Sequence, residues 1–440
     1  MPLIGKEWKT KTGAVVHGDF VSSEEGVLII KSIEGREVKI RRNSLIEADR
    51  KFLVLLENTL SEVGVQAWPR KIPNRSEVRL KGGPRTFRTE HFQIVSGGAD
   101  RVTVASLATI MEDTLEAISA IPTGLELKPP APSTYFQARF MDRVSFDREF
   151  SKVGMHLVIP SQQVKGAYIA AKRELWLPVG TENIGVDALS PTMIHEVCHQ
   201  TMHEWLPLVP VWFLEGFAEY MASVPYEYRT FRFDKSEQGL RKALASRYRM
   251  APSSVNVIHP LKLIHLGNQW QNTTDEYASA LILVYYLIHL DGSGNGDSFK
   301  EFVAEVANSK DDARGMIGDL QSIADTYNSR VNTYRKEIAD YQRKMADVRS
   351  QMRSGQKVFI HSRSNGRLVI GGTPPVPRVP SPPGEAPVEQ ISGERAKTLN
   401  FITQINQKAV AAMIGNRSTD EFIRQMEQAF LKKGFILNFH

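Results

Sequence analysis

Two histidines four residues apart are the first feature of this sequence that could do chemistry. They lie in the run His195-Glu196-Val197-Cys198-His199. On a helix, residues four apart lie one above the other about 6 Å apart, so both imidazoles can reach one tetrahedral zinc ion. Glu196 would then lie beside the open coordination position, where it can take a proton from water. The pattern predicts hydrolysis that depends on one zinc ion per chain.

The residues that follow this run exclude some types of zinc site. His203 continues the spacing of four, but eight residues along one helix put it about 12 Å from His195, too far to share an ion. We interpret His203 as a partly exposed helix residue, with a contact to substrate as the alternative. The metzincin pattern needs glycine at 202 and histidine at 205, and the chain has Met202 and Trp205 there. That pattern is therefore excluded.

A second motif follows at residues 212–220, with the sequence W-F-L-E-G-F-A-E-Y. It resembles the second zinc helix of the gluzincins, a superfamily of zinc metallopeptidases whose third ligand lies in a W-x-x-E-G-F-A sequence. The resemblance implies that Glu215 is the third ligand. It also implies that Glu219, one turn later, accepts a hydrogen bond from the first histidine. A tight loop through Pro207 to Pro210 must connect the two motifs, and a solvated surface acid is the alternative role for Glu219.

The same resemblance implies site residues in two further segments. Residues 276–281 are similar to the aminopeptidase helix in which a tyrosine donates a hydrogen bond to the oxyanion, a role that would belong to Tyr277. In this superfamily the substrate lies as an extra strand on a sheet edge before the metal helix. The segments 165–168 and 175–177 resemble that edge, which makes Gly166 and Tyr168 the expected substrate-binding residues. A packing role is the alternative for Tyr277.

The segment 89–313 must supply the elements that position these residues. Its hydrophobic pattern predicts four strands and one long helix before the metal-binding run: strands at 92–95, 135–140, 155–159 and 175–178, and a helix at 102–121. Ser190-Pro191 predicts the start of the metal-binding helix. Strands followed by helices are an α+β pattern. Together with the resemblance, this predicts a thermolysin-like zincin domain with a mixed sheet.

The first 60 residues predict a separate small β-barrel, because short alternating runs are punctuated by glycines. The runs W-K-T-K-T-G, V-V-H-G-D-F-V, G-V-L-I-I, E-G-R-E-V-K-I and L-I-E-A-D look like the SH3-like homology domain first described in a yeast endocytic adaptor. The resemblance implies a five-stranded barrel with a protein partner. An unrelated small barrel is the alternative.

The C-terminal third predicts a coiled-coil arm. Apolar or small residues recur at gaps of four and three over more than four heptads: Leu320, Ala324, Tyr327, Val331, Tyr334, Ile338, Tyr341, Met345, Val348 and Met352. Pro-rich residues 371–387 predict an extended connection. A stripe made by Leu399, Ile402, Ile405, Ala409 and Met413 could return antiparallel to the seam, which would keep the protein monomeric.

These patterns divide the chain into six segments: a β-barrel at 1–60, a linker at 61–88, the zinc hydrolase domain at 89–313, a coiled-coil helix at 314–356, a Pro-rich linker at 357–391 and a helical region at 392–440.

The bulk composition excludes several classes of protein. The net charge of +6 is spread without a dense basic tract, so we expect no nucleic-acid binding, and no apolar run is long enough to span a membrane. The one cysteine, Cys198, excludes an intrachain disulfide and is expected to be a packing residue. The first ten residues lack the features of a signal peptide. The compartment stays open, with a secreted or periplasmic protein as an alternative if an export signal precedes them.

The sequence therefore predicts a zinc metallopeptidase that acts on a peptide or protein. Two alternatives stay open. An inactive zincin-fold scaffold would bind partners through its SH3-like and coiled-coil parts, and another kind of zinc hydrolase would act on an ester or amide conjugate.

Overall fold

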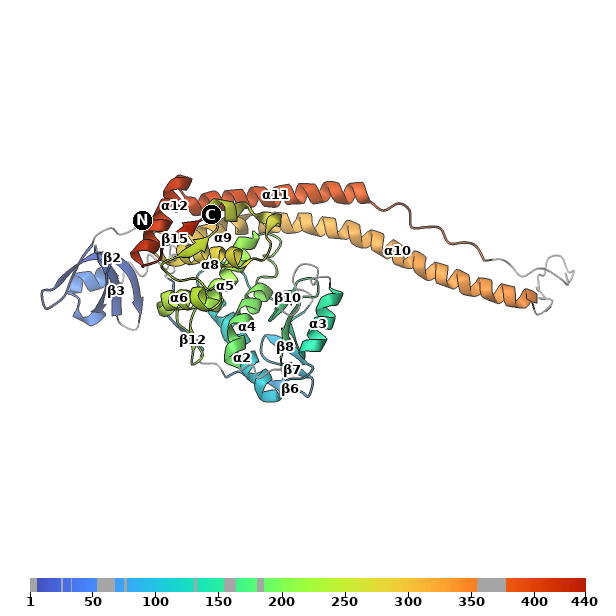
Figure 1. Cartoon of the computed structure of the whole chain (residues 1–440), viewed down its shortest axis with the longest axis horizontal. Coiled ribbons are helices and arrows are strands. Elements are labelled where there is room, and N and C mark those ends of the chain that lie inside the picture. The colour runs from blue at the N-terminus through green and yellow to red at the C-terminus, as the bar shows by residue number, and fades with distance from the viewer. Residues whose placement is uncertain are drawn as a thin grey trace. The chain divides into compact units, whose positions relative to one another are not determined.

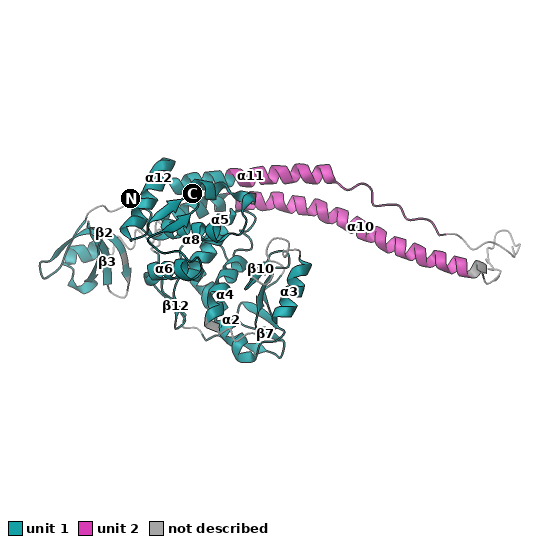
Figure 2. Ribbon diagram, in the orientation of Figure 1, with its two compact units in different colours: residues 1–308, 405–440 teal, residues 309–404 magenta. Residues whose placement is uncertain are grey.

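The computed structural model describes residues 6–24, 27–32, 34–53, 68–74, 77–129, 133–153, 164–179, 186–353 and 377–440. They form a mixed α+β protein with two compact units, residues 1–308 with 405–440, and residues 309–404 (Figure 2). The strand predicted at 155–159 lies outside the described residues. Among the described helices, none combines the length and apolar character needed to cross a bilayer.

The N-terminal segment is an antiparallel meander of four strands: β1 (Lys6–Lys9), β2 (Val15–Glu24), β3 (Val27–Ser32) and β4 (Glu37–Arg41). Its core is made by Trp8, Leu28, Ile30, Ile40, Leu45 and Leu53. In place of the expected fifth strand, a single bridge joins Thr10 to Leu45, and a helix occupies residues 47–53.

A mixed six-stranded sheet follows, in the order β10-β11-β9-β8-β7-β6. Its strands are β6 (Lys81–Gly82), β7 (Thr86–Arg88), β8 (Phe92–Ser96), β9 (Phe136–Met141), β10 (Ala167–Ile169) and β11 (Glu174–Pro178). The central strands β8, β9 and β11 are parallel, and helices α2 (Arg101–Ala120) and α3 (Arg143–Lys152) connect them. Among the described residues, strand β10 pairs only with β11 and forms one edge of the sheet.

Part of the predicted linker 61–88 belongs to this sheet instead. Strands β6 and β7 extend it beyond β8, and β5 (Ile72–Pro73) pairs with β13 (Thr230–Phe231), which follows β12 (Tyr226–Glu227). The glycines and prolines that suggested a linker form the turns of these very short strands. The packing of Trp68, which is buried against Tyr220 and Phe299, also ties the segment to the helices.

Four helices pack in series next to the sheet: α2, α4 (Val186–Thr201), α5 (Val211–Ser223) and α8 (Thr274–His289) (Figure 1). Helix α4 begins before the predicted start, so Pro191 lies inside it. Gly216 sets the approach of α5 to α8, because a Cβ there would lie 2.6 Å from the carbonyl oxygen of Ala280. Helices α4, α5 and α8 carry the histidine run, the second motif and Tyr277.

The remaining elements of the first unit complete its helical side. They are η4 (Phe233–Lys235), α6 (Ser236–Ser246), β14 (Val255–Val257), α7 (Pro260–His265), η5 (Gly267–Gln269), α9 (Asp297–Asn308), α12 (Thr419–Lys432) and β15 (Leu437–Phe439). Strand β15 pairs in parallel with β14, and Phe422 of α12 packs edge-on against Tyr286 of α8. The end of the chain is therefore a part of this unit and not only a helical arm.

The second unit contains α10 (Lys310–Arg353) and the first part of α11 (Val388–Ile414). The predicted seam residues from Leu320 to Met345 are half-buried and Val348 is buried, whereas most residues between them are exposed. Residues 377–387 contain no helix or strand. In the predicted return stripe, Ile405, Ala409 and Met413 are buried, but Leu399 is 49% exposed because it lies on another face of α11.

Candidate metal centre

Three side chains from two neighbouring helices converge on one point. His195 and His199 come from α4, and Glu215 comes from the facing turn of α5. The two Nε2 atoms are 3.0 Å apart, and Oε2 of Glu215 lies 3.3 Å from each of them. Among the described residues, these three form the one group of histidine, cysteine or acidic side chains whose ligand atoms lie close enough to share a metal ion.

The arrangement fits a tetrahedral zinc site. Ligand bonds of about 2.0–2.1 Å from a tetrahedral ion separate neighbouring ligand atoms by about 3.3–3.4 Å, close to the three distances found here. Oε2 of Glu215 is also buried and has no hydrogen-bond partner among the described residues. A buried carboxylate oxygen between two imidazole nitrogens is favourable when a cation lies among them.

A network behind the site orients the first histidine. Nδ1 of His195 lies 3.0 Å from Oε1 of Glu219, one turn along α5 from Glu215. The other carboxylate oxygen of Glu219 accepts hydrogen bonds from Arg247 and Tyr248, each 2.5 Å long. The contact with Glu219 fixes the orientation of the His195 ring, so that its Nε2 faces Glu215 and His199.

The pKa values of these groups follow from burial and from their neighbours. Burial alone would lower the pKa of His195, but the carboxylates of Glu215 and Glu219 raise it well above its usual value. Burial would raise the pKa of Glu219, but Arg247, His195 and Tyr248 lower it to about 2. The two histidines likewise lower the pKa of Glu215 against the effect of its burial. Both carboxylates are therefore ionised and favour positive charge between the ligands.

Glu196 is buried beside the cluster, and burial raises its pKa. Its Oε2 accepts a hydrogen bond of 2.7 Å from the backbone N–H of Tyr168 on the edge strand β10. Gly166 allows this contact, because a Cβ there would lie 2.9 Å from Thr192 of α4. The structure thus brings the predicted edge to the metal helix, with Gly166 buried against that helix.

Tyr277 and His203 are the two remaining candidates with a ring. The ring of Tyr277, on α8, has its centre 6.5 Å from that of His195, and its hydroxyl donates to Asn272 at 3.1 Å. Burial and the nearby carboxylates raise the pKa of Tyr277, so the phenol keeps its proton. His203 lies in the turn after α4, not on the helix, and its Nδ1 is 2.8 Å from the hydroxyl of Tyr168.

Sequence reasoning missed Arg247 and Tyr248. They lie just after α6, about 30 residues beyond Glu219, in a segment without a recognisable motif. The available signal was the resemblance itself, because a buried carboxylate that holds a metal ligand needs positive or donating groups on its other side.

Compared with family models, with curated proteins and with solved structures, the chain has no match.

Proposed function

We propose that the protein is a zinc-dependent peptidase of the gluzincin type, with one zinc ion per chain held by His195, His199 and Glu215. The observation that carries the proposal is the convergence of these three ligand atoms at 3.0–3.3 Å from one another, with Oε2 of Glu215 buried and without a hydrogen-bond partner among the described residues. Structural ion-pair clusters seldom leave a buried carboxylate oxygen without a donor.

Glu196 and Tyr168 have different roles in the proposed reaction. Zinc, when bound, would supply a Lewis acid that polarises water and the substrate carbonyl. Glu196 takes the proton from the attacking water and delivers it to the leaving amine, and its raised pKa makes it a stronger base than an exposed glutamate. The hydrogen bond from Tyr168 N–H fixes one carboxylate oxygen of Glu196, which leaves the other for the water.

Tyr277 is the proposed donor to the oxyanion that develops during attack. Its phenol stays protonated, and its hydroxyl contacts Asn272, a side chain that substrate could replace. Such a donor acts mainly in the transition state, because charge grows on the carbonyl oxygen only then.

The substrate class follows from the edge strand. A peptide that adds to β10 would form main-chain hydrogen bonds along the metal helix. The N–H of Tyr168 already bonds to Glu196, so the carbonyl of Tyr168 would serve the substrate. Gly166 contributes by bringing β10 close to α4.

The finer fold assignments belong to the same proposal. Residues 89–313 would be a thermolysin-like zincin domain, the N-terminal meander an SH3-like barrel with a protein partner, and α10 a coiled coil that pairs within its own chain. The zincin assignment concerns the segment that holds the proposed zinc ligands. The other two assignments concern segments outside it, so the peptidase proposal does not depend on them.

Metal content and hydrolysis of a denatured protein pool test the function together. The parent protein should contain about one zinc ion, and His195→Ala, His199→Ala and Glu215→Ala should lose it, because two protein ligands are too few for a stable site. Glu196→Gln should keep zinc and lose about 10²–10⁴-fold in the rate at which new N-termini appear.

Glu116→Gln is the matched control, because it makes the same change at an exposed position of α2. Zinc retained by Glu215→Ala would disprove the ligand set. Unchanged turnover in Glu196→Gln would show that hydrolysis does not use this site.

A further inference from the structure

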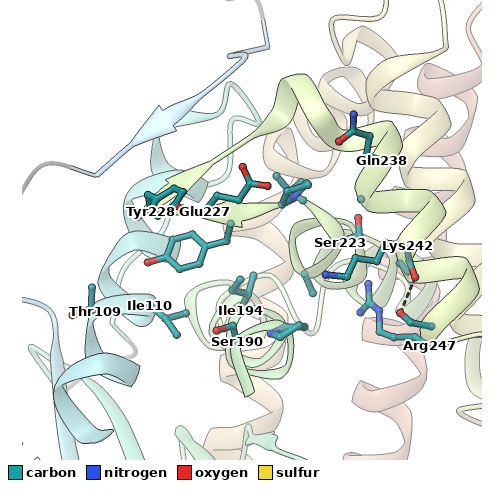
Figure 3. A pocket seen from close by; sticks show the side chains of 18 of the residues that line it. Thr109, Ile110, Ser190, Ile194, Ser223, Glu227, Tyr228, Gln238, Lys242 and Arg247 are labelled. Carbon is teal, nitrogen blue, oxygen red and sulfur yellow. Dashed lines mark hydrogen bonds between the residues drawn. The ribbon is translucent and has the colours of Figure 1, made fainter. Parts of the chain in front are cut away.

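A cavity with a volume of about 780 Å³ lies beside the first part of α4. Residues of α2, the first part of α4, the end of α5, β12 and α6 line it (Figure 3). None of the residues proposed to bind zinc or to act on substrate is among its lining residues. We call it the α6 pocket. Its volume is in the range of sites for small organic ligands, about 300–1,000 Å³.

Two cationic side chains at one end of the α6 pocket have unused binding capacity. Lys242 of α6 has no ion-pair partner among the described residues. Arg247 uses its Nη1 atom to hold Glu219, while its Nη2 atom is buried and has no hydrogen-bond partner within the described part of the chain. In Figure 3 both side chains lie opposite Thr109 and Ile110 of α2. A buried, unpartnered guanidinium nitrogen is costly unless a ligand satisfies it.

The one acidic side chain in the lining does not cancel this charge. Glu227 is bound by Lys235 at 2.7 Å and lies 3.7 Å from Arg232, and neither of these cations lines the pocket. The charge of Lys242 therefore remains available to a ligand, whereas Arg247 is already paired with Glu219 and offers only its second nitrogen, Nη2.

Three hydroxyl groups of the lining are already engaged as donors. Thr109, Ser223 and Ser246 each donate to a main-chain carbonyl of their own helix. They can accept hydrogen bonds from a ligand but cannot supply the donors that an anion needs. Lys242 and Arg247 are the cationic side chains of the lining, so we place the anionic group of a ligand beside them.

The rest of the pocket suits an apolar body. Ile110, Ile194 and Val224 lie in its wall, and the ring of Tyr228 on its rim is 100% exposed. An exposed aromatic ring at the mouth of a cavity can cover a bound ligand by stacking or apolar contact.

We propose that the α6 pocket binds a small organic anion whose carboxylate or phosphate contacts Lys242 and Arg247 and whose apolar body lies against α2 and α4. This inference goes beyond the peptidase proposal and does not rest on it. Arg247 would take part in both sites, because it also holds Glu219 behind the metal centre.

Calorimetric titration of the full chain tests the proposal. The probes are N-acetyl-L-phenylalanine for a carboxylate, phenyl phosphate for a phosphate, and N-acetyl-L-phenylalanine amide as the uncharged counterpart. At least one anionic probe should bind with a dissociation constant in the millimolar range or below, and the amide should bind about tenfold more weakly or not at all.

The variant Lys242→Gln should weaken binding of that probe about tenfold, and Lys242→Arg should restore it. Lys262→Gln, the same change at an exposed position of α7, should have no effect. Arg247 is left intact because of its bond to Glu219. Binding of the acid alone or the phosphate alone would identify the anionic group.

Three results would overturn the proposal. The first is that neither anion binds. The second is that the amide binds as well as the acid. The third is that binding survives unchanged in Lys242→Gln, which would assign it to the metal centre or to another surface.

Discussion

Replacement of Glu219 by glutamine isolates the role of the network behind the metal centre. Glu219 accepts from His195 through one oxygen and from Arg247 and Tyr248 through the other. An amide has one acceptor oxygen, and the two donors from Arg247 and Tyr248 should claim it. The amide NH₂ group would then face Nδ1 of His195 and favour the tautomer with its proton on Nε2, the atom that must bind the metal.

The size of the effect follows from this geometry. Loss of an oriented carboxylate partner typically costs 10–100-fold in metal affinity, or about 1.4–2.7 kcal/mol. The preference for the wrong tautomer places Glu219→Gln near the upper end, about 100-fold. The low pKa of Glu219, about 2, means that the parent keeps this contact until strong acid. Acid release of zinc should instead follow protonation of the two imidazoles.

Competition with a fluorescent chelator measures the zinc affinity of each variant. The pH at which half of the zinc is released gives a second measure. Because two imidazole protons compete with each zinc ion, a 100-fold loss should raise this pH by about one unit. Glu116→Gln should match the parent in both measurements. If Glu219→Gln folds normally and binds zinc within about twofold of the parent, Glu219 does not orient His195 and the reasoning fails.

Three further predictions concern the oxyanion, the buried His289 and the arm. Tyr277→Phe should lower kcat about 10²–10³-fold with little change in KM, as steady-state kinetics would show, whereas an unchanged rate would make Tyr277 a packing residue. Burial lowers the pKa of His289 to about 3, so the imidazole stays neutral in the folded protein. Its Nε2 lies 2.8 Å from the hydroxyl of Tyr220. Its contribution to stability is present above pH 6.5 and is lost as the pH falls towards 3, at up to about 1.4 kcal/mol per pH unit. In His289→Gln, the free energy of unfolding measured in urea should therefore fall less steeply with falling pH. Replacement of residues 314–394 by a flexible linker should leave the zinc content unchanged, and both proteins should be monomers in light scattering. If the parent is a dimer and the replacement converts it to a monomer, the intrachain pairing is contradicted.

Local patterns predicted some of the helices and strands, although α3, α6, α7 and α9 were not predicted. The apolar residues between 102 and 121 repeat with the helical period, and α2 spans Arg101–Ala120 with Asp100 as its N-cap. The spacing of the two histidines works in the same way, because it depends only on the geometry of one helix. These predictions need no knowledge of distant parts of the chain.

Features that depend on distant contacts were missed. Strand β15 pairs with β14 some 180 residues earlier, and its three residues carry no pattern that separates them from a helix end. Strands β6 and β7 are two and three residues long, too short for alternation to show, so their glycines suggested a linker. Leu399 was assigned to the wrong face of α11 because one helical stripe cannot be distinguished from its neighbour before its partner is known.

The same distinction explains why the candidate ligands could be found from sequence and their support could not. His195, His199 and Glu215 lie on two helices that are consecutive in the chain, so a short stretch of sequence contains the whole set. Arg247 and Tyr248 reach the site only because the end of α6 returns to α5. The close approach of α5 to α8 requires a residue without a side chain at Gly216, and α8 then brings the ring of Tyr277 to within 6.5 Å of that of His195. The proposed metal centre therefore depends on packing around residues that would not bind the metal, and substitutions at those positions should also alter it.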